Sequence, residues 1–285
     1  MPKRAQPKVA LALCPGLPQD VAVQVVLRGH IARFGRELAR LTQHDPPPDA
    51  THLTRVALRR LRGALQAASP RIDRHLNTQI CRRLRVLFRA LGVVRDAEVL
   101  AEHGGSDAGR QPLAARERKA LRKGLKASDA AHLAKDMGAL FAGKSWRKAS
   151  KAARARRKDP IETLANLALN RAWARATNLG ASVTALAPLP RHALRKRLKS
   201  LRYIAEDFAP LWPAEASIAF LAALSDLQDD LGLLNDMDLA AAQGLPRDGD
   251  LAKAALARAE GRWQWLCAQP PWWAPPTALQ PPSLA

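Results

Sequence analysis

Apolar residues recur with helical spacing along most of this chain. Leu58, Leu61 and Leu65, for example, lie three or four positions apart, which is the spacing of one face of an amphipathic helix. Proline and glycine breaks separate the segments that carry this pattern. The pattern predicts helices over 19–44, 51–68, 72–103 and 113–142, and again over 160–181, 190–209, 213–243 and 249–267.

Two separate motifs recur at one fixed offset of 140 positions. Residues 52–62 align with 192–202, and residues 91–96, which begin Leu-Gly and end in Asp, align with 231–236. We therefore predict an all-α fold of two pseudo-symmetric four-helix bundles that arose by internal duplication. In each copy a glycine, Gly92 or Gly232, is expected to kink or restart the third helix, with the following aspartate as its N-cap.

These boundaries divide the chain into five parts. They are an irregular N-terminal segment 1–18, a first bundle 19–143, a basic connector 144–158, a second bundle 159–268 and a tail 269–285 rich in proline and tryptophan. The connector holds eight basic residues and no acidic one, and we expect Arg147, Lys151, Arg154 and Lys158 to share one helix face. For the tryptophans near the end of the chain we expect a packing role.

Composition supports the helical prediction and narrows the class of protein. Only 25 of the 285 residues are Val, Ile or Thr, whereas Ala and Leu dominate, so an extensive sheet is not expected. The three cysteines are too few and too widely spaced for a disulfide framework or a zinc site, which fits a reducing compartment. No apolar run reaches the ~20 residues of a membrane span. We therefore expect a cytoplasmic protein.

The net charge points to a polyanionic partner. The chain carries 46 basic and 25 acidic residues, a net charge of +21. Residues 1–202 have a net charge of +28 and residues 203–285 one of −7. A field of this strength attracts nucleic acid, an acidic membrane surface or a polymeric phosphate.

The basic residues form stripes on three of the predicted helices. At about 100° per residue, each stripe spans an arc of about 60–80° next to the apolar face. The stripes comprise His52, Arg55, Arg59 and Arg62; His192, Arg195, Lys199 and Arg202; and Arg82, Arg85 and Arg89. Like charges on neighbouring turns repel, so we expect an external anion to neutralise them. Arginine and lysine bind phosphate oxygens strongly, and a histidine that faces phosphates should have a raised pKa.

Other candidate chemistry is weaker. Five aspartates, Asp226, Asp229, Asp230, Asp236 and Asp238, could suggest a metal site, but pairing with basic helices or capping is the favoured interpretation. His75, His103 and His132 stand alone, and no motif joins a nucleophile to a base. Base-stacking aromatic residues are scarce near the stripes, where only Tyr203 is in place.

The two histidine motifs resemble those of the CHAD family, the conserved histidine α-helical domain. The resemblance lies in His52-x-x-Arg55 with the arginines that follow it, in Arg195-Lys196 with Tyr203, and in the Leu-Gly motifs at 91–96 and 231–236. It covers roughly residues 20–267. It implies two helical bundles related by a pseudo-two-fold axis, binding of inorganic polyphosphate and location on polyphosphate granules.

Matching the family motifs adds Lys196 to the stripe residues. The predicted polyphosphate ligands are therefore His52, Arg55, Arg59, Arg62, His192, Arg195, Lys196, Lys199 and Arg202, with Arg82, Arg85 and Arg89 added from helix geometry. Many relatives carry a CYTH domain ahead of this one, for which the chain has no room. The sequence thus resembles a stand-alone member, and we expect no catalytic residues, no metal and no cofactor.

The favoured hypothesis is a non-catalytic protein that binds polyphosphate in a basic groove between the two helical halves. One alternative is a helical protein that binds nucleic acid. The other is a metal-dependent phosphohydrolase that uses the aspartates between Asp226 and Asp238.

Overall fold

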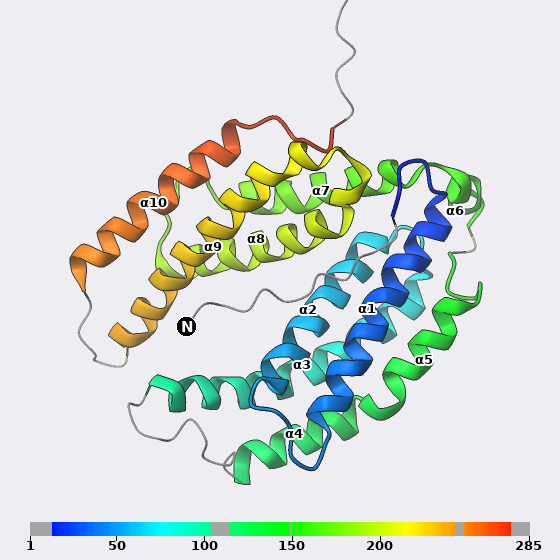
Figure 1. The fold of residues 1–285 in the computed structure, drawn as a ribbon, viewed down its shortest axis with the longest axis horizontal. Helices are drawn as coiled ribbons and strands as arrows, with labels where there is room; N and C mark the ends of the chain where they lie inside the picture. Colours follow the sequence, from blue (N-terminus) through cyan, green and yellow to red (C-terminus); the bar gives the residue numbers. More distant parts are fainter. Residues whose placement is uncertain (1–12, 104–114, 149, 243–247, 275–285) are drawn as a thin grey trace, which may run out of the picture. The chain divides into compact units, whose positions relative to one another are not determined.

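The computed structural model describes residues 13–103, 115–148, 150–242 and 248–274, and these are almost entirely helical (Figure 1). This confirms the predicted all-α class. None of the described helices combines the length and apolar character needed to cross a membrane. The chain forms two compact units that divide between Asp159 and Pro160, with Cys14–Gly16 belonging to the second.

Unit 1 is a set of antiparallel helices that pack in the order of the chain. It contains α1 (Gln19–Leu41), α2 (Ala50–Ala68), α3 (Arg74–His103), α4 (Ala115–Ala127) and α5 (Ala130–Ala142). Helix α1 packs against both α2 and α5, and α3 packs against both α2 and α4. The core is made of the side chains predicted to be apolar, and Leu58, Leu61 and Leu65 of α2 are all fully buried.

The predicted helix over 113–142 is wrong in one respect, because the structure divides it into α4 and α5. Asp129 lies between them with a φ of 49°, in the left-handed region that aspartate tolerates better than most residues. Arg83 of α3 fixes this break: its Nε donates to the carbonyl of Ser128 (3.1 Å) and its Nη2 to Oδ2 of Asp129 (2.9 Å). Among its described residues, unit 1 therefore has two shorter helices, α4 and α5, where the sequence predicted one.

Residues 144–158 pack on unit 1 and do not form one basic helix. They contain the short α6 (Lys151–Ala155) and the 3-10 turn η2 (Arg156–Lys158). Trp146 is fully buried, and Arg147 Nε lies 2.8 Å from Oδ2 of Asp20, a buried carboxylate on α1. Arg147 precedes α6, so the expected face shared by Arg147, Lys151, Arg154 and Lys158 does not exist as a single helical stripe.

Unit 2 contains α7 (Ile161–Thr177), α8 (Pro188–Phe208), α9 (Ala214–Ala242) and α10 (Gly249–Ala268), with the 3-10 turn η3 (Ala209–Leu211) after α8. Each helix packs on the next. Helices α7, α8 and α9 begin within two residues of the positions that the offset of 140 gives from α1, α2 and α3. This agreement supports the duplication, which stays a prediction.

An aromatic cluster closes one end of unit 2. Trp173 of α7 lies 5.7 Å from Trp263 of α10 and 6.5 Å from Trp273 (ring centroids). The indole nitrogen of Trp273 donates to the side chain of Asn170 (2.7 Å). Tryptophans near the end of the chain thus have the packing role expected for them. The rest of the predicted tail, 275–285, lies outside the described residues, as do residues 1–12 of the N-terminal segment.

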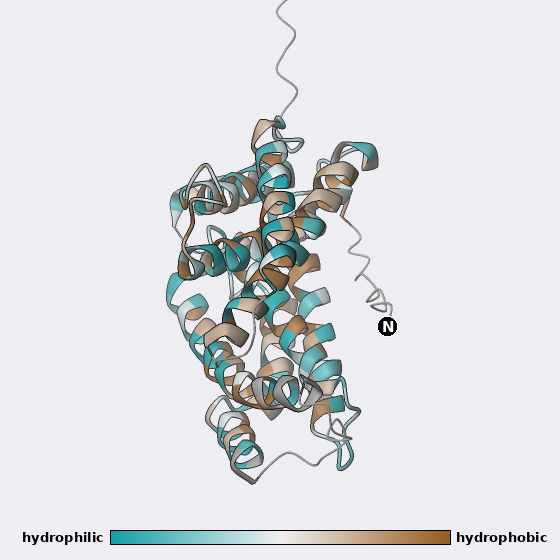
Figure 2. Ribbon diagram, turned by 90° about the vertical axis from the view of Figure 1, so that its left-hand side faces the viewer, coloured by the Kyte–Doolittle hydropathy of each residue, from teal (hydrophilic) through white to brown (hydrophobic). Residues whose placement is uncertain are grey.

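Most helices show the two-sided pattern from which they were predicted. In Figure 2 hydrophobic and hydrophilic residues alternate around the ribbons, as expected of helices with one buried face. In α8 the apolar side consists of Leu194, Leu198 and Leu201, each fully buried. The cationic stripes therefore start from rigid, well-packed helices.

We predict that Asp20→Asn destabilises unit 1 by about 2–3 kcal/mol, because it removes a buried carboxylate that pairs with partly buried guanidinium groups. Arg147 and Arg157 both lie within 4 Å of Oδ2 of Asp20, at 2.8 and 3.5 Å. Urea unfolding followed by circular dichroism measures the change. The matched control is Asp136→Asn, an exposed carboxylate 4.0 Å from Arg83, which should cost less than about 0.5 kcal/mol. Equal losses in the two variants would contradict the structural role of Asp20.

Candidate functional site

The α2 stripe lies where the sequence predicted it, beside the buried leucines of the same helix. His52 is exposed, and Arg55, Arg59 and Arg62 are half-buried. Their positions follow from helix geometry, since residues three and four apart share a face. One helix therefore presents three guanidinium groups on successive turns.

The three arginines converge on one aromatic ring. Phe88 of α3 is half-buried, and the guanidinium carbons of Arg55, Arg59 and Arg62 lie 4.8, 5.7 and 5.2 Å from its ring centroid. All three distances fall within the range of a cation–π interaction. The expectation that Tyr203 is the only aromatic residue near the stripes is therefore wrong. The helical spacing gave no sign of Phe88, because the contact joins two helices.

One of the three α3 arginines, Arg85, lies near the arginines of the α2 stripe. Burial lowers the pKa of Arg62, and the nearby charges of Arg85 and Arg59 lower it further, against an opposing effect of Cys81. Arg85 therefore lies close enough to Arg62 to repel it. Burial raises the pKa of the Cys81 thiol, whereas Arg62 and Arg85 oppose that rise. Arg82, Arg85 and Arg89 are all exposed on α3.

The α8 stripe of unit 2 has the same spacing and different partners. Lys196 is exposed, and His192, Arg195, Lys199 and Arg202 are half-buried. Arg202 donates to the hydroxyl of Ser225 (2.9 Å) and its Nε lies 3.7 Å from Oε1 of Glu206. Its guanidinium carbon is also 5.7 Å from the ring of Tyr203. Part of the charge of this stripe is thus compensated by the protein itself.

The pKa of His192 is lowered from its ordinary value. Burial is the largest cause, the charges of Lys196 and Arg195 act in the same direction, and a hydrogen bond with the side chain of Asn235 opposes them. We expected a raised pKa for a histidine that faces phosphates. In the protein alone burial, and to a smaller extent the neighbouring cations, disfavour the charged imidazole, so the direction is reversed.

The two Leu-Gly motifs make room for an arginine and do not restart a helix. Helices α3 and α9 run without interruption through Gly92 and Gly232, so the predicted restart is wrong. A Cβ on Gly92 would lie 3.0 Å from Nη1 of Arg55, and one on Gly232 would lie 3.5 Å from Nη2 of Arg195. Each glycine therefore faces the arginine of the His-x-x-Arg motif in its own unit. In each unit the two motifs therefore meet in space.

The acidic residues of α9 form ion pairs, as favoured from the sequence. Asp230 pairs with both Arg258 (3.0 Å) and Arg262 of α10. Asp238 pairs with Arg191 at 2.6 Å. Within the described part of the chain no group of three or more His, Cys, Asp or Glu residues is arranged to hold a metal ion.

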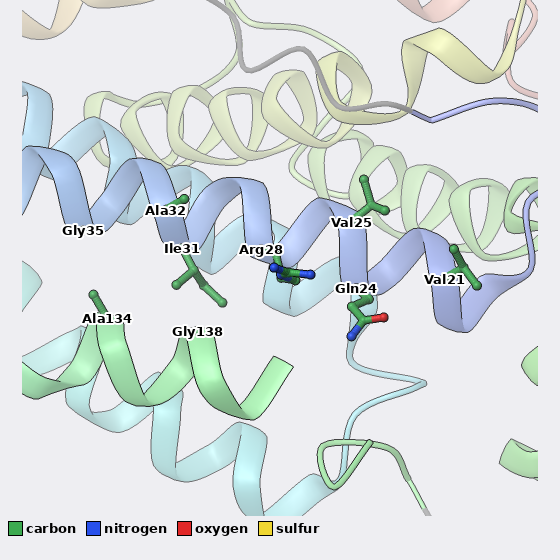
Figure 3. A pocket seen from close by; sticks show the side chains of 9 residues that line it. All are labelled: Val21, Gln24, Val25, Arg28, Ile31, Ala32, Gly35, Ala134 and Gly138. Carbon is green, nitrogen blue, oxygen red and sulfur yellow. The ribbon is translucent and has the colours of Figure 1, made fainter. Parts of the chain in front are cut away.

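A surface cavity of about 580 Å³ lies elsewhere on unit 1, between α1 and α5 (Figure 3). Its lining includes Val21, Ile31, Ala134 and Gly138, with Arg28 as its basic residue. Stripe residues do not contribute to this lining. The cavity is therefore distinct from the predicted polyanion site.

Comparison with known proteins identifies the family. The model of the CHAD domain matches residues 25–243. The fold is similar to the crystal structure of the CHAD domain from the plant Ricinus communis, with a TM-score of 0.57, 23% sequence identity, and coverage of 94% of this chain and 91% of that one. No curated protein matches. Because the family model spans most of the chain and the solved structure has the same fold, this protein belongs to the CHAD domain family.

Proposed function

We propose that this protein binds inorganic polyphosphate through the cationic stripes of α2 and α8 and catalyses no reaction on it. The CHAD family is associated with polyphosphate binding. The proposal extends that association to twelve residues of this chain: His52, Arg55, Arg59, Arg62, Arg82, Arg85, Arg89, His192, Arg195, Lys196, Lys199 and Arg202. Location in the cytoplasm, on polyphosphate granules, belongs to the same proposal.

The observation that carries the proposal is the crowding of arginines on α2 and α3. Arg55, Arg59 and Arg62 share one ring, and Arg85 is near enough to Arg62 to lower its pKa. Crowded cations cost stability unless an anion neutralises them. A polymer with a negative charge on every phosphate supplies such charges at short, regular intervals, and guanidinium groups bind its oxygens by charge-assisted hydrogen bonds.

The arginines and lysines of the stripes are donors alone, which supports a binding role. Arginine and lysine offer N–H groups and positive charge, and they supply no nucleophile or base at neutral pH. Three of the five aspartates proposed for a hydrolase, Asp226, Asp230 and Asp238, lie within ion-pair distance of arginines. That the two stripes line one groove between the halves stays a prediction of the sequence.

Charge reversal of both stripes tests the proposal. We predict that Arg55→Glu, Arg59→Glu, Arg195→Glu and Lys199→Glu together weaken binding of a polyphosphate of defined length by roughly a hundredfold or more, since four charge-assisted contacts are lost. Fluorescence anisotropy at fixed salt measures the affinity. Binding of the unaltered protein should also weaken as salt rises.

The matched control reverses four exposed cations of α4 in the same chain, by Lys119→Glu, Arg122→Glu, Lys123→Glu and Lys126→Glu. Both variants change the net charge by the same amount, so the comparison shows whether binding depends on where the cations lie or only on the net charge. It should retain most of the affinity. An equal loss in both variants would mean non-specific attraction, and tighter binding of RNA or single-stranded DNA at equal charge concentration would favour the nucleic-acid alternative.

The pH dependence of binding provides a second test. Since the pKa of His192 is lowered in the free protein and a bound polyanion raises it, binding takes up a proton. Affinity for a long polyphosphate should therefore increase as pH falls from the pKa of His192 in the complex to its lowered pKa in the free protein, by up to about tenfold for each unit between the two. His192→Gln should flatten this profile, and an unchanged profile in that variant would exclude His192 from the site.

Alanine substitutions at Gly92 and Gly232 distinguish an effect on stability from an effect on polyphosphate binding. Alanine within a helix is more stable than glycine by about 1 kcal/mol, but a Cβ at position 92 would press on Nη1 of Arg55. Gly92→Ala should therefore leave the melting temperature unchanged or raised and weaken polyphosphate binding roughly threefold. Gly232→Ala, whose Cβ makes an ordinary contact with Arg195, is the control and should bind normally. Identical affinities for the two variants would show that the position of Arg55 does not matter.

A further inference from the structure

The α2 and α8 stripes occupy matching sequence positions, but different side chains contact their arginines. In unit 1 the arginines lie against the ring of Phe88. The offset of 140 places Gln228 at the equivalent position of α9. Gln228 is buried, and its amide donates to the carbonyl of Leu198 (3.2 Å). Unit 2 therefore has a polar side chain bonded to the backbone where unit 1 has an aromatic ring.

The kind of contact decides which donors remain for a ligand. A guanidinium group that lies over a ring uses its face, and the N–H groups at its edge can still donate; one of them, Nη1 of Arg55, lies 3.5 Å from the carbonyl oxygen of Phe88. A guanidinium group held by a hydroxyl and a carboxylate uses the N–H groups themselves. Arg202 is held in the second way, by Ser225 and Glu206, in addition to its contact with the ring of Tyr203. In unit 1 the position that corresponds to Ser225 is Arg85, a further cation.

A ring shared by three arginines also reduces the cost of ordering them. A free arginine side chain loses rotamer freedom when it binds a phosphate. Contact with a half-buried ring restricts Arg55, Arg59 and Arg62 before a ligand arrives, and preorganisation of this kind increases affinity. A ring carries no net charge, so contact with it leaves the positive charges of Arg59 and Arg62 to attract an anion.

We propose that Phe88 is a positioning residue of the polyphosphate site, and that it makes the α2 stripe the stronger of the two binding surfaces. This inference rests on the proposed function, because it concerns how one of its two stripes is organised. It adds a residue without charge or hydrogen-bonding groups to the site, and it assigns unequal roles to two copies of one motif.

The first test replaces the ring. Phe88→Leu keeps an apolar side chain of similar length and removes the aromatic face, so it should weaken binding of a long polyphosphate about five- to tenfold. The salt dependence should not change, because no charge has been removed. Phe88→Tyr restores the aromatic face and should bind within about twofold of the unaltered protein. A Phe88→Leu variant that is folded and binds normally, or a Phe88→Tyr variant that binds as weakly as Phe88→Leu, would overturn the role of the ring.

The second test compares the two units without altering Phe88. Arg59→Gln with Arg62→Gln removes two charges from the α2 stripe, and Lys199→Gln with Arg202→Gln removes two from the α8 stripe. We expect the first pair to weaken binding at least fivefold more than the second. Equal losses, or a larger loss from the α8 pair, would overturn the inequality of the stripes even if Phe88→Leu failed to fold.

The same measurements distinguish failure of this inference from failure of the proposed function. If the unaltered protein does not bind polyphosphate, the proposed function is wrong. If it binds and both comparisons show no difference, the function stands and only the role of Phe88 and the inequality of the stripes are wrong. Melting curves of every variant show whether a loss of binding reflects unfolding.

Discussion

The site depends on the convergence of like charges on one aromatic ring. Arg55, Arg59 and Arg62 occupy neighbouring turns of α2, where guanidinium groups repel one another. Phe88 offsets part of that repulsion through its electron-rich face. The buried leucines of the same helix fix the backbone from which the arginines extend. The result is a rigid cationic surface whose remaining charge is complementary to a polyanion.

A second constraint is the space that each unit leaves for an arginine. Gly92 and Gly232 lie inside uninterrupted helices, where glycine is unfavourable, and each faces the arginine of its own His-x-x-Arg motif. Each helix is thus less stable locally at the point where the arginine of the facing motif needs room. The partners of the two stripes differ, however, so motifs that match in sequence do not give the two units identical chemistry.

The sequence predicted those features that arise within one helix. The all-α class, the bounds of most helices, the buried leucine faces and the stripes all follow from a period of 3.6 residues, and these expectations agree with the structure. Contacts between helices were not predictable in this way. Phe88 beneath three arginines, the glycines against Arg55 and Arg195, and the break at Asp129 fixed by Arg83 all join residues far apart in the chain. A helix period carries no information on such pairs.

The most direct measurement of the central claim is an NMR titration of the arginine side chains of the full chain with polyphosphate. The account predicts that the Nε–H signals of Arg55, Arg59 and Arg62 shift together and saturate at one stoichiometry, while that of Arg122 on the exposed face of α4 changes little. Small, uniform and unsaturable shifts of all arginine signals would show that the polymer is attracted only by net charge, and would contradict the account.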